Sequence, residues 1–233
     1  MTTKLLRSDI NRILREAETF MASFGYVLPP FANWTPAEMR AREGEITNIT
    51  RSGLGWDITD FGMGDFEKTG LLLFTSRNGR LADLKRGGGM LYAEKAMISR
   101  LDQITPSHTH ILKTEDIINR GGGTLVVELF GGSNGLCDRD RGTSVVCDGI
   151  ERTLPPGARL RLQPGESVTL MPGDWHAFWA ETCDVFVAEV STVNDDATDN
   201  IFEDPRVTRF SGIEEDADPY RLLVSDYATW LKE

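Results

Sequence analysis

Residues 167–193 read SVTLMPGDWHAFWAETCDVFVAEVSTV, and three short apolar runs in this stretch are separated by turn residues. The runs SVTL, HAFWA and DVFVAEVSTV are rich in β-branched and aromatic side chains, which favour strands. Pro, Gly and Asp between the first two runs are typical of tight turns. The stretch therefore predicts consecutive β-strands with no helix between them.

The same pattern of short strand-like runs separated by turn residues extends over most of the chain after about residue 50. So many short strands without long helical segments between them predict an all-β sandwich or barrel rather than a parallel βαβ sheet. A triple glycine before one of the strands is expected to form a turn or bulge. The other strand-like runs are WDITDFG, GLLLFTS, EKAMISRL, TLVVELF, SVVCDG and RLRLQP.

Helical patterns occupy the first fifty residues. From Ser8 and Asp9 to Gly25, apolar side chains recur at the spacing of one helical face. Ser8 or Asp9 can cap this helix and Gly25 can end it. The sequence TPAE from residue 35 resembles the start of a second, short helix.

Composition predicts one globular domain with a substantial core, since 40% of the 233 residues are hydrophobic and 26% are charged. Within it we expect an N-terminal helical extension over residues 1–50 and a barrel over residues 51–233. The chain has 36 acidic and 25 basic residues and a formal charge of −11. Nucleic acid and anionic membranes would be repelled, so we expect neither as a partner.

A cytoplasmic location is predicted from the N-terminus and the cysteines. The N-terminus has no basic region followed by an apolar core, which argues against a signal peptide or a membrane span. The three cysteines are odd in number and none belongs to a C-x-x-C pair. They indicate small buried side chains rather than a disulfide framework or a zinc–thiolate site.

All three histidines of the chain lie in two short stretches, ITPSHTH and PGDWH. Residues two apart on a strand point to the same face, about 7 Å apart, so His108 and His110 can reach one ion. Glu115 can reach the same ion if the chain bends before it. His176 begins a strand that would lie beside the first pair in a closed barrel. The pattern predicts one metal ion held by three nitrogen atoms and one carboxylate.

A single H-x-H pair also occurs on strand surfaces without a function, but here no histidine lies outside the two stretches. Three nitrogen ligands and one carboxylate suit Mn²⁺, Fe²⁺, Co²⁺, Ni²⁺ or Zn²⁺ with open coordination positions. The sequence does not choose among these metals. A substrate with adjacent oxygen atoms could fill the open positions, and the metal would act on it as a Lewis acid.

The two stretches resemble the cupin motifs, G-x5-H-x-H-x3,4-E-x6-G and G-x5-P-x-G-x2-H-x3-N. HTHILKTE supplies the core of the first motif and Gly122 its closing glycine, while Asp102 replaces the leading glycine. In the second motif Gly165 and PGDWH are present, and Ala180 replaces the final Asn. Over nearly the whole chain, VLPPFANWTP, KTEDIINRGGGTLVVEL, HAFWAE and AEVSTVNDDATDNIF are similar to the D-lyxose ketol-isomerase family.

This resemblance implies a double-stranded β-helix, or jelly-roll cupin barrel, and a homodimer. It also implies interconversion of D-lyxose and D-xylulose, with D-mannose and D-fructose as further substrates, using a divalent metal such as manganese. Moving a proton between C2 and C1 through an enediol requires a base, a proton donor and a cation that holds the developing charge. The metal meets the last of these needs.

Lys113 and Glu189 are the candidate catalytic residues. Lys113 lies two residues before Glu115, so its ammonium can approach substrate oxygens beside the ion; spacing alone leaves a solvated lysine open, and the resemblance favours the proton donor. Glu189 lies in the middle of an apolar strand, and burial would raise its pKa towards a value useful for a base. Both alternating sets of that strand are apolar, so its orientation stays open, as does an ion pair with a distant Arg or Lys.

Trp175, Asp199 and Arg209 are the candidate substrate-binding residues. Trp175, together with Phe178 and Trp179, can form an apolar wall under a sugar ring or belong to the core. Asp199 and Arg209 are candidates for contacts with sugar hydroxyl groups. The surrounding NDDATDN lacks the final Glu and Gly of an EF-hand, so it predicts an Asx-rich turn rather than a calcium loop.

Two other functions use the same residues. A cupin dioxygenase can hold Fe²⁺ with three histidines and one glutamate, but it requires oxygen, whereas an isomerase does not. A non-catalytic sugar-binding cupin would bind without turnover. Lys113→Ala should abolish isomerase turnover while the metal is retained, and a binding protein has no turnover to lose.

Overall fold

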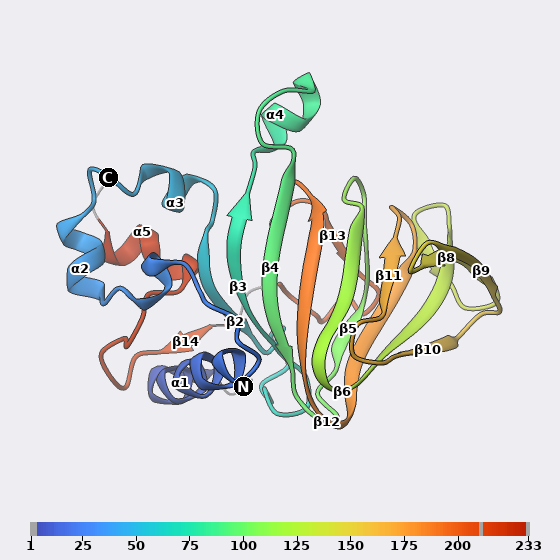
Figure 1. The fold of residues 1–233 in the computed structure, drawn as a ribbon, viewed down its shortest axis with the longest axis horizontal. Coiled ribbons are helices and arrows are strands. Elements are labelled where there is room, and N and C mark those ends of the chain that lie inside the picture. Colours follow the sequence, from blue (N-terminus) through green and yellow to red (C-terminus); the bar gives the residue numbers. More distant parts are fainter. Residues whose placement is uncertain (1–3, 210–211, 232–233) are drawn as a thin grey trace.

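In the computed structural model, which describes residues 4–209 and 212–231, a sheet of twelve strands curls around an apolar core (Figure 1). The strand order is β2-β3-β4-β12-β6-β11-β8-β9, with β5 beside β12, β13 beside β5, and β7 and β10 beside β6. The all-β fold class is confirmed, and the architecture is the antiparallel barrel that the cupin resemblance implies. The strands are β2 Gly55–Thr59, β3 Leu71–Asn78, β4 Tyr92–Ser99, β5 Thr105–His110, β6 Glu115–Ser133, β7 Leu136–Asp138, β8 Thr143–Cys147, β9 Ile150–Leu154, β10 Ala158–Leu162, β11 Ser167–Leu170, β12 Trp175–Thr192 and β13 Asn200–Phe202.

The long strands β6 and β12 pair with each other almost from end to end and organise the barrel. The first half of β12 also pairs with β5, and its second half also pairs with β4. The predicted runs HAFWA and DVFVAEVSTV are therefore one continuous strand. Likewise, β6 includes residues 115–123, which the sequence analysis did not assign to a strand.

Glycine bulges allow these two strands to remain paired while they bend. The register between β6 and β12 shifts at two points close to the predicted triple glycine. Gly122 has a φ of 96°, a left-handed conformation that glycine tolerates best. A Cβ atom on Gly123 would lie 2.3 Å from the carbonyl oxygen of Glu181. The expected turn or bulge is thus a β-bulge.

The barrel core lies between the strands and is almost entirely aliphatic and aromatic. Because alternate strand residues share one face, each strand contributes every second side chain to it. Residues at the edge of this core also line the candidate site described below. The buried core residues are Phe61, Leu71, Leu73, Met97, Ile117, Leu125, Val127, Leu129, Val145, Cys147, Leu160, Leu162, Val168, Leu170, Phe178, Ala180, Val185, Val187 and Val207.

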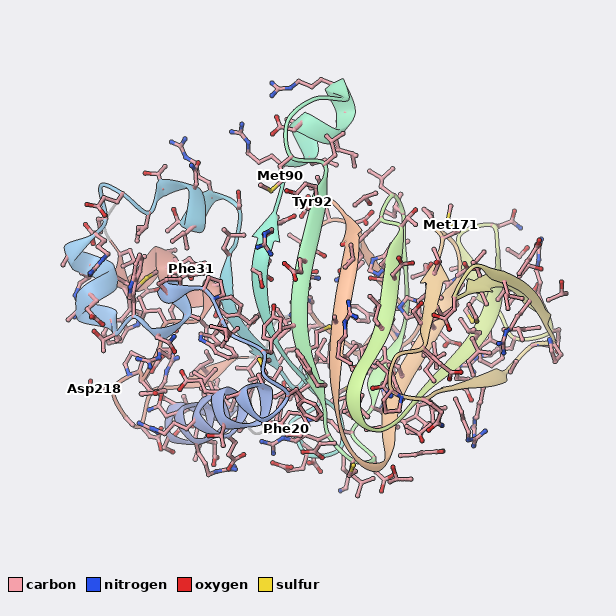
Figure 2. The ribbon with its side chains drawn as sticks, in the orientation of Figure 1. Phe20, Phe31, Met90, Tyr92, Met171 and Asp218 are labelled. Carbon is pink, nitrogen blue, oxygen red and sulfur yellow. The ribbon has the colours of Figure 1, made fainter. Side chains whose placement is uncertain are left out.

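Helix α1 (Arg7–Ser23) packs its apolar face on the outer side of β2, β3 and β4. Figure 2 labels Phe20 at the end of this helix and Phe31 in the 3-10 turn η1 (Pro30–Asn33), and both pack against the same apolar cluster. The outer face of this part of the sheet is consequently covered rather than exposed to solvent.

The predicted cap of α1 is wrong. Neither Ser8 nor Asp9 caps the helix, which begins one residue earlier, at Arg7, without a side-chain cap. Instead, Asp216 accepts hydrogen bonds from the backbone N–H of Ser8 at 2.9 Å and from its hydroxyl at 2.6 Å. A carboxylate from far along the chain therefore binds the free donors of the first turn.

The predicted start of a short helix at residue 35 is confirmed. Helix α2 (Pro36–Ala41) begins with a capping box, in which Thr35 Oγ1 accepts from the Glu38 backbone N–H and the Glu38 carboxylate accepts from the Thr35 backbone N–H. The other helical segments are α3 (Thr47–Arg51), α4 (Leu81–Arg86), η2 (Val224–Asp226) and α5 (Tyr227–Trp230).

The C-terminal segment packs against the N-terminal helices. Strand β14 (Ile213–Glu214) pairs in parallel with β1 (Leu5–Leu6). The buried Arg7 guanidinium lies 2.7 Å from both Asp226 Oδ1 and Glu215 Oε1. Met39, Ile46, Leu222, Tyr227 and Leu231 form a separate apolar cluster between the two ends of the chain.

All three cysteines are free thiols, as expected. Cys147 is buried and Cys137 is half-buried, but Cys183 is exposed, so the expectation of buried or half-buried cysteines is wrong for Cys183. Among the residues whose placement is described, no helix combines the length and the apolar character needed to span a bilayer.

Candidate metal centre and active site

The four predicted metal ligands come together in one buried group. Candidate ligand atoms of His108, His110, Glu115 and His176 all lie within 4.8 Å of one another. His108 and His110 extend from β5, and the sheet register places His176 directly opposite His108. Glu115 is the first residue of β6. The fold therefore supplies the convergence that the spacing suggested.

Backbone carbonyl groups orient two of the imidazole rings. Nδ1 of His108 lies 2.8 Å from the carbonyl oxygen of Pro106, and Nδ1 of His176 lies 3.2 Å from that of Asp174. A carbonyl oxygen only accepts hydrogen bonds, so each Nδ1 carries the proton and each Nε2 presents a lone pair. A carbonyl oxygen that accepts from the other ring nitrogen in this way fixes the orientation of a metal-binding imidazole.

The group fits a bound cation. His176 Nε2 is buried and has no hydrogen-bond partner among residues 4–209 and 212–231. It lies 3.2 Å from Glu115 Oε1, and His110 Nε2 lies equally far from the same oxygen. Burial lowers the pKa of His108 and of His110, which favours the neutral, ligating form. His110 Nε2 can donate to Glu115 Oε1 when no ion is present. The lone pairs of His108 and His176 also converge on this carboxylate, and a positive ion between these groups would satisfy them.

A chamber inside the barrel adjoins this group. Part of its lining is apolar and is formed mainly by Phe61, Leu71, Leu73, Met97, Ile117, Phe178 and Phe202. The lining also includes charged side chains, namely Lys95, Lys113, Glu189, Asp196 and Arg209. We call this space the chamber; an apolar lining with a few polar groups is typical of small-molecule sites.

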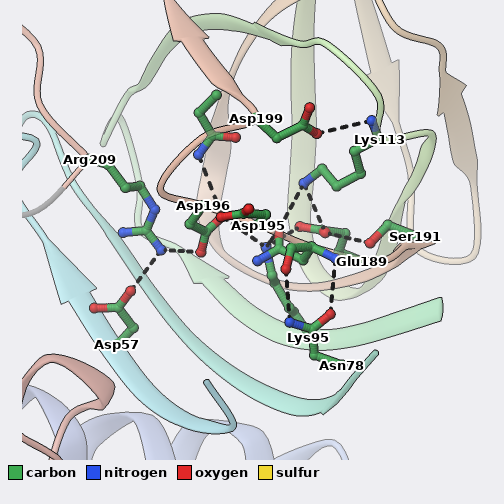
Figure 3. Close-up of polar contacts among 12 residues, drawn as sticks. Asp57, Asn78, Lys95, Lys113, Glu189, Ser191, Asp195, Asp196, Asp199 and Arg209 are labelled. Atoms are coloured by element: carbon green, nitrogen blue, oxygen red, sulfur yellow. Dashed lines mark hydrogen bonds and ion pairs between the residues drawn. The ribbon is translucent and has the colours of Figure 1, made fainter. Parts of the chain in front are cut away.

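Lys113 connects the metal group to Glu189. Its Nζ lies 2.7 Å from Glu115 Oε2. The same atom lies 3.1 Å from Glu189 Oε1 (Figure 3). Burial opposes the ammonium form, but the carboxylates of Glu115 and Glu189 hold the pKa of Lys113 above its ordinary value. Burial alone would raise the pKa of Glu115, yet Lys113 and His110 hold it well below its usual range. Both groups are therefore charged.

Lys95 is a chamber residue that the sequence analysis missed. It lies opposite Glu189 in the pairing of β4 with β12, and its Nζ is 3.3 Å from Glu189 Oε2. Asn194 Oδ1 accepts a 2.7 Å hydrogen bond from the same ammonium. Its sequence context could have indicated it, because Lys95 is a charged residue within the largely apolar run YAEKAMIS. The same kind of context identified Glu189.

Arg209 lies in the chamber wall between two carboxylates. Its Nη2 atom is 2.7 Å from Asp57 Oδ2 and 2.8 Å from Asp196 Oδ2 (Figure 3). Burial raises the pKa of Asp57. Although burial acts in the same direction on Asp196, the charges of Arg209 and Lys95 hold its pKa well below the ordinary value. Sequence reasoning identified Arg209 but neither of its partners.

Asp199 faces the backbone rather than the chamber. Its carboxylate accepts hydrogen bonds from the backbone N–H groups of Ile111, Leu112 and Lys113 at 3.1, 2.8 and 3.0 Å. These bonds hold the bend that brings Glu115 back towards His110. The neighbouring Asp195 caps its own turn, as expected for an Asx-rich loop.

Trp175 does not line the chamber. It is 2% exposed and borders a separate outer groove together with Gly132 and Asp174. Phe178, three residues later on β12, is the aromatic residue of this stretch that lines the chamber. Trp179 instead contacts Arg159, whose Cζ lies 5.3 Å from the centre of the Trp179 ring.

Similarity to known proteins extends over nearly the whole chain. The model of the D-lyxose isomerase family matches residues 5–227. A D-lyxose/D-mannose isomerase from Serratia proteamaculans is 45% identical over 96% of this chain and 98% of its own length. Another from Escherichia coli O157:H7 is 43% identical over 95% of this chain and 97% of its own length.

Solved structures show the same fold at lower sequence identity. An L-ribose isomerase from Cellulomonas parahominis superimposes with a TM-score of 0.59 at 16% identity, covering 92% of this chain and all of that one. The L-ribose isomerase of Geodermatophilus obscurus gives 0.56 at 18% identity, with 92% and 100% covered. The family model and the two relatives cover nearly the whole chain, and the protein therefore belongs to the D-lyxose isomerase family.

Proposed function

We propose that this protein is a metal-dependent aldose–ketose isomerase that interconverts D-lyxose and D-xylulose, and also D-mannose and D-fructose. Membership of the D-lyxose isomerase family and the names of the two relatives support this substrate class. One observation carries the proposal: the buried group of three histidines and one glutamate shares a chamber with a Lys113–Glu189 pair whose charged atoms are 3.1 Å apart.

His108, His110, Glu115 and His176 would hold the ion, which when bound supplies a Lewis acid for two neighbouring oxygens of the sugar. We propose manganese as this metal because the family resemblance favours it. Cobalt, iron, nickel and zinc are alternatives that suit the same donor atoms.

Proton transfer is the task of the neighbouring residues. Glu189 removes the proton from C2 of the aldose while Lys113 gives a proton to O1, which produces the enediol. Glu189 then returns its proton to C1 while Lys113 takes the proton from O2, and the ketose results. Both residues end in their starting protonation states, so no co-reactant is consumed.

The chamber favours this chemistry over side reactions. Lys95 lies 3.3 Å from Glu189 Oε2, and Ser191 donates to Oε1, the oxygen that Lys113 also contacts, so both oxygens of the carboxylate are held in place. The apolar side chains that line the chamber limit the access of water to the enediol. Arg209 lines the same space, where its guanidinium can donate to hydroxyl groups of the sugar.

We also propose a cytoplasmic homodimer. The free thiols are consistent with a reducing compartment, and the family resemblance supports the dimer. Light scattering coupled to size-exclusion chromatography would test the assembly, and a monomeric mass would contradict it.

Metal removal and replacement in the absence of oxygen tests the proposed activity. After chelation the protein should form no ketose from D-lyxose, and Mn²⁺ should restore turnover without O₂. A panel of aldopentoses and aldohexoses would then rank the substrates. An absolute requirement for O₂ would favour the dioxygenase, and sugar binding without turnover would favour the binding protein.

A further inference from the structure

Asp57, Arg209 and Asp196 separate the chamber from a second, outer cavity; we call them the far-wall group. Arg209 borders the chamber, Asp57 borders the outer cavity, and Asp196 borders both. The outer cavity is also lined by polar residues such as Ser52, Thr75 and Asn78. Three side chains thus form a partition between two spaces.

Ion pairs rather than apolar packing hold this partition. The Arg209 side chain is only 10% exposed, and its Nη2 is 2.7 and 2.8 Å from the two carboxylates. Asp57 Oδ1 also accepts a 2.9 Å hydrogen bond from the backbone N–H of Ile58. Both carboxylates accept from the same terminal nitrogen, Nη2, so the position of that nitrogen depends on both.

Charged contacts lead from the metal group to the far wall. Glu115 contacts Lys113, which contacts Glu189, which contacts Lys95. The Lys95 ammonium lies 3.6 Å from Asp196 Oδ1, and Asp196 binds Arg209. If C1 and C2 of a sugar lie beside the metal group, its remaining carbons extend along this row towards Arg209.

We infer that the far-wall group limits the length of aldose that the chamber accepts. It thereby determines the ratio of activity on a hexose to activity on a pentose. This inference rests on the proposed function. A hexose chain is one CHOH unit longer than a pentose chain, so its terminal hydroxymethyl group would lie closer to Arg209. Asp57 contributes as a positioning residue, because it holds the guanidinium from the far side without bordering the chamber.

Asp57→Ser tests the inference. Serine removes the carboxylate that holds Arg209 in place and leaves room towards the outer cavity, while its hydroxyl can still accept from the Ile58 N–H. The ratio of kcat/KM for D-mannose to that for D-lyxose should rise about tenfold, the low end of the range for one methylene in a fitted pocket. A ratio is insensitive to the fraction of active enzyme.

Asp57→Asn is the isosteric comparison, because it keeps the volume although its single oxygen can accept from only one of the two donors, Arg209 Nη2 and the Ile58 N–H. Its ratio should rise less than that of Asp57→Ser, because no space opens towards the outer cavity. An unchanged or lower ratio in Asp57→Ser would overturn the inference, even though wild-type turnover of D-lyxose would still uphold the proposed function. Absence of turnover of any aldose by the metal-loaded wild type would instead refute the proposed function.

Binding to the wild-type protein gives a second measurement that needs neither turnover nor a variant. Calorimetry on the metal-loaded protein would compare the polyols obtained by reducing D-lyxose and D-mannose. The pentitol should bind several-fold more tightly than the hexitol. Equal affinities would overturn the inference that the far wall limits length.

Discussion

Replacing Lys113 by methionine should reduce catalysis severely while leaving the metal bound. The side chain keeps its length but loses the ammonium that lies 2.7 Å from Glu115 and 3.1 Å from Glu189. General acid–base catalysis typically contributes a factor of about 10²–10⁴. We expect kcat to fall by that amount, which corresponds to about 3–5 kcal/mol in the activation free energy.

The same variant should be less stable, and by an amount that depends on the metal. At these separations Coulomb's law with an effective dielectric constant of about 20 gives gross attractions of about 6 and 5 kcal/mol. Desolvation offsets much of this, and breaking a buried pair costs about 3–5 kcal/mol net. In the metal-free protein Glu115 would lose its principal counter-charge, whereas a bound ion would replace it.

Three measurements check these expectations. Initial rates of D-xylulose formation give kcat, elemental analysis gives the metal content, and urea unfolding with and without metal gives stability. The control is Lys68→Met, since Lys68 is 83% exposed and its 3.0 Å ion pair with Asp65 lies at the surface. If Lys113→Met retained kcat within a factor of about two at equal metal content, the assigned role would be wrong.

Other substitutions test the metal group, a bulge and the contact between the chain ends. His176→Ala should lower metal affinity by at least about 100-fold, because even losing a partner behind a ligand costs about 10–100-fold; full occupancy by elemental analysis would contradict this. Gly123→Ala places a Cβ 2.3 Å from a backbone oxygen of β12 and should cost at least about 1–3 kcal/mol in urea unfolding, whereas Gly44→Ala, with open space around it, should be nearly neutral. Hydrogen bonding to Arg7 lowers the pKa of Glu215. The pair therefore stabilises the folded protein fully at a pH above the ordinary carboxyl pKa. This stabilisation is lost as the pH falls through the lowered pKa. The stability difference between wild type and Glu215→Gln should therefore vanish on acidification, and a constant difference would refute the linkage.

The metal ligands could be predicted from the sequence because most of their geometry is local. The H-x-H spacing determines that His108 and His110 share a strand face, and Glu115 follows within one bend. What the sequence did not show is how that bend forms: Asp199, almost ninety residues later, binds three consecutive backbone N–H groups there. Asp199 was a candidate sugar contact because a carboxylate can bind hydroxyl groups, and not because the sequence indicated where its side chain lies.

The orientation of Glu189 could not be predicted because both faces of its strand are buried. Val185 and Val187 pack in the barrel core, while Phe186 packs under helix α1. With α1 covering the outer face, the alternation of polar and apolar residues that normally identifies the inner face disappears. Glu189 shares the inward face with the two valines and borders the chamber.

The partners of the predicted charges depend on pairing between distant segments. Lys95 meets Glu189 through the register of β4 with β12, and Arg209 meets Asp57 across 152 positions in the sequence. One chain without homologous sequences contains no direct signal for such pairs. Each member can nonetheless be recognised as a charge within an apolar run, and opposite charges of this kind are candidates for pairing.

The cap that Asp216 provides for α1 has a consequence for the order of folding. Ribosomes make the first helix early, yet its first turn and the Arg7 side chain find their partners only 208 and 219 positions later. Closing such long loops is slow because the entropy loss precedes the contacts that compensate it. We expect the N-terminal helix to be among the last elements to dock, after the barrel has formed and the end of the chain has left the ribosome.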